Sequence, residues 1–79
     1  MRVAEMKKNA LERIYELARL AAKLNYKGRE EEAKVAADHV DEHIEAYCGI
    51  GLITWIEGMA KKHDAYYDTR KALQAEEKE

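Results

Sequence analysis

Apolar and small residues recur every three or four positions along the first third of the chain. This stripe contains Val3, Ala10, Ile14, Leu17, Ala21 and Leu24 and is followed by the sequence Asn-Tyr-Lys-Gly at 25–28. Such a period is typical of a helix that buries one face, and asparagine and glycine tolerate the left-handed backbone that ends helices. The pattern predicts a helix over about 3–25, followed by a turn.

A second stripe lies further along the chain and contains Ala33, Ala37, Val40, Ile44 and Tyr47. Three glutamates, at 30–32, precede it, and their charges suit the positive end of a helix dipole. We therefore expect a second helix over about 29–48. Residues 48–53 then interrupt the pattern with two glycines among apolar residues, which indicates an unusually apolar loop.

A third helix is predicted over about 54–75. Thr54 followed by Glu57 fits a capping box, in which the two side chains satisfy free backbone N–H groups at the helix start. Large residues then recur at heptad-like spacing, at Ile56, Met59, His63, Tyr66, Arg70 and Leu73. Because an unpaired charge is costly inside a buried stripe, His63 and Arg70 require either partners or solvent.

Together the three stripes predict an all-α fold, an antiparallel three-helix bundle that forms a single domain over residues 1–79. A helical hairpin that completes its core by dimerising is the alternative. Proline is absent and only four glycines occur, which favours long helices. A chain of 79 residues is also too short to enclose a large active site.

The overall charge restricts the partners of the chain. The formal net charge is -2, which argues against nucleic acid and anionic membranes as general partners. No apolar run reaches the length of a membrane span, and the first twenty residues lack the apolar core of a signal peptide. The single cysteine, Cys48, agrees with a reducing compartment. We expect a cytoplasmic protein.

Charge separates strongly along the chain. Residues 1–29 hold eight basic side chains against three acidic ones, whereas residues 30–47 hold seven acidic side chains against Lys34. Attraction between the first two helices is the simpler interpretation. An acidic surface that meets a basic partner is the functional one.

Two segments resemble MIT (microtubule-interacting and trafficking) domains. Residues 17–33, with the sequence LARLAAKLNYKGREEEA, are similar to the first hairpin of these domains and, less specifically, of TPR-like repeats. Lys62, Tyr66, Asp68 and Leu73 resemble the third MIT helix. The resemblance implies a groove between helices that accepts amphipathic tails of ESCRT filament subunits, with Lys62 and Tyr66 near it.

The third helix carries the residues that we expect to bind a partner. They are aromatic, basic or sulfur-containing and comprise Trp55, Met59, Lys62, His63, Tyr66, Tyr67 and Arg70. Tyrosine and tryptophan are enriched where an apolar surface meets water, and basic groups suit a carboxylate, a phosphate or an acidic helix. The sequence predicts a non-enzymatic adaptor or small inhibitor that binds a partner helix or acidic segment there. Alternatively, Arg70 pairs with an acid of the second helix inside the bundle or lies at the exposed end of the bundle.

Two other functions remain as alternatives. Lys62, His63, Tyr67 and Arg70 could hold a small anion or a nucleotide at the interface of an oligomer, for which a homodimer is the simplest form. The string His-x-x-Glu-His at 39–43 gives a helical metal site at Glu32, His39 and His43, although structural histidines are the simpler interpretation. No phosphate loop, Ser-His-Asp arrangement or paired-cysteine motif is present, so neither catalysis nor a cofactor is expected.

Overall fold

The protein is an all-α three-helix bundle. The computed structural model describes residues 2–77, which form α1 (Val3–Tyr26), α2 (Glu30–Gly49) and α3 (Trp55–Glu77) and contain no strand. The expected boundaries differ from these by two residues at most. Residues 1, 78 and 79 of the expected domain lie outside the described residues.

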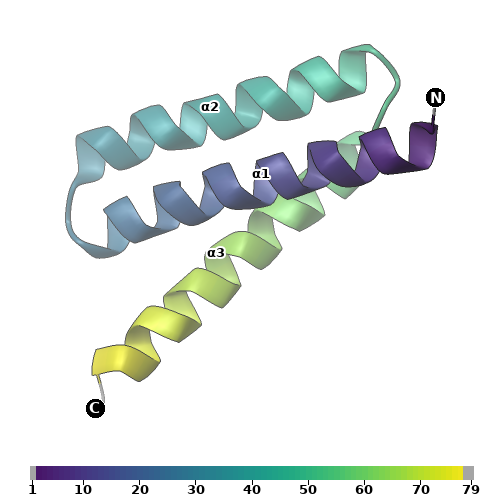
Figure 1. Ribbon diagram of the computed structural model, residues 1–79. Coiled ribbons are helices and arrows are strands. Elements are labelled where there is room, and N and C mark those ends of the chain that lie inside the picture. Colours follow the sequence, from purple (N-terminus) through teal and green to yellow (C-terminus); the bar gives the residue numbers. More distant parts are fainter. Residues whose placement is uncertain (1, 78–79) are drawn as a thin grey trace.

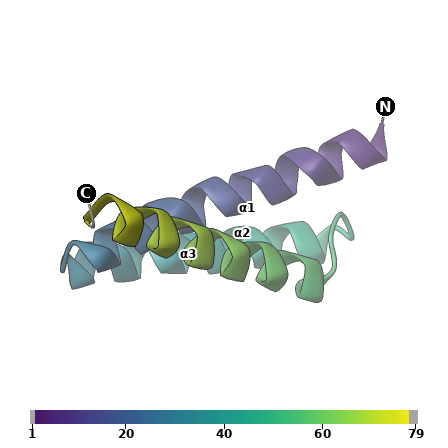
Figure 2. The same cartoon turned by 90° about the horizontal axis from the view of Figure 1, so that it is seen from below.

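The helix α1 lies at the centre of the bundle. Both α2 and α3 pack along it, whereas α2 and α3 meet each other only over a short stretch. In Figures 1 and 2 the N-terminus and the connection between α2 and α3 lie at one end of the molecule, and the C-terminus lies at the other. Figure 1 also shows that α3 crosses α1 and leaves α2 as it runs towards the C-terminus. The helices α2 and α3 therefore lie side by side near their connection and separate towards the C-terminus.

Both interhelical turns contain a glycine with a left-handed backbone. Gly28 (φ 79°) follows α1 and Gly51 (φ 74°) follows α2, and each adopts the left-handed backbone that a side chain disfavours. The N–H of Arg29 then donates to the carbonyl of Leu24, and that of Leu52 to the carbonyl of Tyr47. These are six-to-one hydrogen bonds of the Schellman type, which satisfy carbonyls left free at helix ends.

The capping box at the start of α3 forms as the sequence predicts. The N–H of Glu57 donates to the hydroxyl of Thr54 at 3.1 Å, and the N–H of Thr54 donates to the carboxylate of Glu57 at 2.9 Å. That carboxylate also pairs with Lys7 of α1 at 2.5 Å. The cap therefore fixes both the first turn of α3 and its position against α1.

The core consists of small and medium-sized side chains. Its buried members are Ala10, Ile14, Ala18, Val40, Ile44, Ile53 and Ala65, and Leu11, Tyr15, Leu17, Tyr47, Cys48, Leu52 and Met59 pack against it. The first two predicted stripes supply most of this set, although Val3 is 67% exposed. The two isoleucines of the apolar connection between α2 and α3 differ in burial: Ile53 is buried, whereas Ile50 is 73% exposed.

Candidate functional site

The buried face of α3 differs from the stripe that the sequence predicts. Its buried residues are Gly58, Ala65 and Thr69, all of them small. The expected heptad-like stripe was wrong in its orientation, since Ile56 is 78% exposed and His63 and Arg70 are exposed as well. The hydroxyl of Thr69 has no hydrogen-bond partner among residues 2–77.

The orientation of α3 follows from close packing against α1 and α2. Ala18 of α1 and Ala65 of α3 belong to the same buried cluster, and small residues on both helices allow the two backbones to approach closely. Gly58 is closer still to α2, because a Cβ atom there would lie 2.8 Å from Cγ2 of Ile44. The large side chains of α3 are consequently displaced to its flanks.

One of these displaced side chains, Tyr66, stands at the opening between α2 and α3. It is partly buried, and this burial is the main reason that the pKa of its hydroxyl is raised. Two adjacent hollows, of about 340 and 330 Å³, share Tyr66 and Asn25 in their linings. The hollow of about 330 Å³ lies between α1 and α3, and that of about 340 Å³ is bounded by α1, α2 and Tyr66. We name the two together the α2–α3 groove.

The α2–α3 groove has a floor of small residues and a polar rim. Its lining comprises Ala21, Ala22, Asn25 and Tyr26 of α1, Glu30, Ala33, Lys34 and Ala37 of α2, and Tyr66 and Arg70 of α3. Beside Arg70, interaction with the Glu77 carboxylate raises the pKa of the Tyr26 hydroxyl. The floor offers no bulky side chain, so an incoming segment could approach the backbone of α1 closely.

An ion pair marks the closed end of the α2–α3 groove. The ammonium group of Lys62 donates to the carboxylate of Asp41 at 2.8 Å, and its side chain is only 16% exposed. This ion pair joins α3 to α2 one turn beyond Gly58, where the two helices are in close contact. On α3 the lining of the groove runs from Tyr66 to Arg70 and on α2 from Glu30 to Ala37, a length of roughly 10 Å at 1.5 Å per residue.

The predicted partner-binding residues therefore divide into two groups. Tyr66 and Arg70 line the α2–α3 groove and Lys62 marks its closed end. Met59 packs against the core, whereas Trp55 and Tyr67 are 51% and 66% exposed outside the groove lining.

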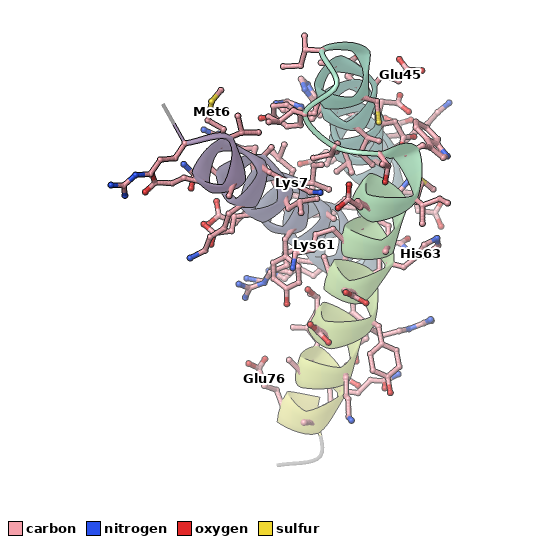
Figure 3. All side chains as sticks on the ribbon, turned by 90° about the vertical axis from the view of Figure 1, so that its right-hand side faces the viewer. Met6, Lys7, Glu45, Lys61, His63 and Glu76 are labelled. Carbon is pink, nitrogen blue, oxygen red and sulfur yellow. The ribbon has the colours of Figure 1, made fainter. Side chains whose placement is uncertain are left out.

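The predicted partner-binding residues outside the core also differ in orientation and in their charged neighbours. Figure 3 shows His63 on the side of α3 that faces away from α1. The ammonium group of Lys71 lies 5.7 Å from the ring centre of Tyr67, an arrangement that covers this ring with a cation. Arg70 has no ion-pair partner on α2 among residues 2–77, so the predicted internal pair does not form. Its guanidinium group stays available at the groove rim.

The candidate metal ligands do not converge. Both carboxylate oxygens of Glu32 accept hydrogen bonds from Arg29, at 2.8 and 2.5 Å. Nδ1 of His43 lies 2.7 Å from the carbonyl oxygen of His39, while Nδ1 of His39 lies 3.9 Å from Glu42. Within residues 2–77, no group of three potential ligands has the spacing of a metal site. The geometry favours structural roles for both histidines.

Sequence reasoning missed the α1 and α2 walls of the groove. The pattern predicts Asn25 in a turn and Ala33 and Ala37 on the buried face; Ala33 is indeed buried, and all three also line the open groove. The available signal was the paucity of large side chains: α2 has alanine at 33 and 37 opposite the alanine-rich end of α1. Small residues at helical spacing fill a core poorly on their own, so they indicate either very close packing or an unfilled space.

The fold and the groove define a small helical bundle with an open hollow on its surface. Scans against protein-family models, curated proteins and solved structures give no match for this chain. Across the part of the chain that the structure describes, no helix combines the length and apolarity needed to cross a membrane.

Proposed function

We propose that the protein is a non-enzymatic interaction module that holds an amphipathic helix of a cytoplasmic partner protein in the α2–α3 groove. The placement of Tyr66 and Arg70 carries this proposal. Both side chains line an open groove instead of the bundle core, and its floor is built of alanines. A surface of this kind resembles the apolar grooves that receive helical peptides.

The dimensions of the groove fit a short helix. The roughly 10 Å of lined groove accommodates about two turns of an incoming helix, or ~7 residues. The alanines of the floor favour small or medium-sized apolar residues on the buried face of the incoming helix, because helices with small contact residues approach closely. Arg70 and Lys34 at the rim favour an acidic residue near one end of the segment.

The resemblance to MIT domains predicts which kind of protein supplies the bound helix, and it stays a prediction. Under that prediction, the occupant is an amphipathic tail of an ESCRT filament subunit and the protein acts as an adaptor. An inhibitor that occupies its groove with a helix of a target protein has the same physical requirements. The experiment below distinguishes the two by identifying the partner.

A charge-matched pair of variants tests the proposal. Proteins that co-purify from the source organism with the wild type are compared with those captured by Arg70→Ala and Lys71→Ala. Both substitutions remove one exposed positive charge from adjacent positions of α3, but only Arg70 lines the groove. The helical segment of a captured partner is then made as a peptide, and its Kd is measured by titration calorimetry.

We expect Arg70→Ala to weaken peptide binding by at least ~10-fold, because a hydrogen bond to a charged group contributes about 1.5–3 kcal/mol. Lys71→Ala should leave the Kd within about twofold. Neither change should shift Tm, since both side chains are exposed. Equal loss of stability and binding in Arg70→Ala, or equal weakening by Lys71→Ala, contradicts the proposed site.

A further inference from the structure

A second surface lies on the hairpin formed by α1 and α2. A hollow of about 500 Å³ is lined there by Leu20, Leu24, Glu31, Glu32, Val35, Ala36 and His39, a set that we name the hairpin face. Leu20 is 51% exposed and Val35 is 60% exposed. Two large aliphatic side chains side by side on neighbouring helices form an apolar patch that water hydrates unfavourably.

The hairpin face continues along α1 on the flank that is turned away from α3. Met6, Arg13 and Leu20 follow one another at intervals of seven residues, which is close to two helical turns. Figure 3 shows Met6 pointing away from α3, whereas Lys7 lies on the side that faces α3. At 40% exposed, Met6 extends the apolar surface towards the exposed Ile50 at the end of α2.

The two helices of this face carry charges of opposite sign, and the described residues form no ion pair between these helices, although Glu32 of the face pairs with Arg29. Residues 1–29 are predominantly basic and residues 30–47 predominantly acidic, yet no ion pair joins α1 to α2 within the described chain. Arg13 takes part in no ion pair there. Glu42 has only the distant contact of 3.9 Å with His39. Arg13 and Glu42 are therefore opposite charges on neighbouring helices without a close ion-pair partner in the described chain.

The register of the hairpin places these charges at matching heights. Leu20 and Val35 line the same hollow, and α1 and α2 run in opposite directions. Seven residues back from Leu20 is Arg13, and seven residues on from Val35 is Glu42. The two charges therefore stand at the same level along the bundle, one on each edge of the hairpin face.

We propose that the hairpin face is the interface of a homodimer in which two copies pack about a two-fold axis parallel to α1 and α2. This axis places α1 of one copy over α2 of the other at an unchanged height. Leu20 then meets the apolar hollow beside the partner's Val35, and Arg13 meets the partner's Glu42. Each contact occurs twice, so the surface is complementary to itself.

Charge selects this axis over the other two-fold arrangement. An axis perpendicular to the helices would stack α1 on the partner's α1, with Arg13 directed at the partner's Lys27. The size of the surface also suffices, because α1 is ~36 Å long and two adjacent helices are ~20 Å wide. The resulting area of roughly 700 Å² per copy approaches the ~800 Å² of a standard specific interface.

Charge reversal on the full chain tests the homodimer. Sedimentation equilibrium over a concentration series is measured for the wild type, for Arg13→Glu, for Glu42→Arg and for an equimolar mixture of these two variants. We expect the wild type to reach twice the chain mass of 9.1 kDa. Each reversal places like charges together twice per dimer and should weaken the dimer by at least ~10-fold.

The mixture separates an interface between copies from a contact within one chain. Arg13→Glu supplies glutamates at both 13 and 42, and Glu42→Arg supplies arginines at both, so a mixed dimer has two opposite-charge pairs. We expect the dimer mass to return in the mixture. Arg19→Glu is the matched control, because Arg19 lies beside Tyr15 and Asp68 on the α3 side of α1 and should leave the dimer intact.

Three results overturn the homodimer. The first is a wild type that stays monomeric at every concentration, which would leave the hairpin face to a different protein. The second is a mixture that stays monomeric although both reversed variants remain folded by circular dichroism. The third is a Leu20→Glu variant that is folded and still fully dimeric. The groove proposal is unaffected by any of these, because none of the altered residues lines the groove.

Discussion

At the scale of single residues, the Glu57 carboxylate joins two helices through one charge. It pairs with Lys7 of α1 and accepts the backbone N–H of Thr54 at the start of its own helix. These contacts, with Lys7 first, lower the pKa of Glu57 from its ordinary value of 4.5. Because the charged form is favoured by folding, its stabilisation is present above pH 4.5 and is lost as pH falls through the lower, folded-state pKa.

We predict that Glu57→Gln is less stable than the wild type at pH 7, and that this difference shrinks as pH falls below 4.5 and vanishes below the folded-state pKa of Glu57. The amide keeps an acceptor for the Thr54 N–H but cannot pair with Lys7. Urea unfolding at a series of pH values measures the difference, and Glu12→Gln, an exposed acid of α1 for which the structure gives no ion pair, is the control. A difference between Glu57→Gln and wild type that persists unchanged at pH 3 would show that charge is not its cause.

At the scale of the elements, the contact between α3 and α2 depends on the missing side chain at Gly58. A Cβ atom there would lie 2.8 Å from Cγ2 of Ile44, which is fully buried, and 3.2 Å from Cδ1 of Ile53. We predict that Gly58→Ala destabilises the protein by about 1–3 kcal/mol, because overpacking outweighs the gain in helix propensity of about 1 kcal/mol. Thermal unfolding followed by circular dichroism measures this change.

Gly49→Ala provides the matched control. Gly49 lies at the end of α2 with φ outside the left-handed region, and a Cβ atom there would meet nothing within 4 Å. The same substitution should therefore raise stability slightly at Gly49. Combining Gly58→Ala with Ile44→Ala should cost less than the sum of the two separate losses, since the new methyl group enters the cavity. Strict additivity would show that Ile44 is not the obstacle.

The sequence predicts α1 and α2 well because their large apolar residues do face the core. Ile14, Val40 and Ile44 are fully buried, and the glycine turns at 28 and 51 follow from backbone chemistry alone. The stripe of α3 misleads, because pattern analysis assumes that the largest residues are buried. The small residues of α3 pack best against the alanine-rich surface of α1. This preference cannot be predicted from the pattern of α3 alone, because it depends on the helix that α3 contacts.

At the scale of the whole molecule, two surfaces of different kinds lie on different sides of α1. The α2–α3 groove opens where α3 diverges from α2, whereas the hairpin face lies on the other flank of α1. The sequence alone could not predict either surface, because each is formed by residues that are distant along the chain. The sequence does show the charge separation and the alanines. Whether these residues pack in the core or line an open surface depends on how the three helices are arranged.

The divergence of α3 from α2 also determines where the bundle is least stable. The Lys62–Asp41 pair joins α3 to α2, and Tyr66 still lies beside α2 in the groove lining. Further along α3, Arg70 and Leu73 line hollows with α1. We predict that amides at 70–73 exchange with solvent at least ~10-fold faster than those at 58–69, because local opening there breaks few buried contacts. Hydrogen exchange followed by mass spectrometry or NMR measures these rates.

Asp41→Ala should extend the fast exchange towards residue 62, since it removes the ion pair that holds α3 beside α2. Asp38→Ala, which removes an exposed charge from the same helix, should leave the pattern unchanged. A C-terminal half of α3 that opens locally would let the groove adapt to an incoming helix, at the cost of some affinity for ordering it. Uniform exchange along α3 would mean instead that the groove is rigid, and that its occupant must fit the hollow as it stands.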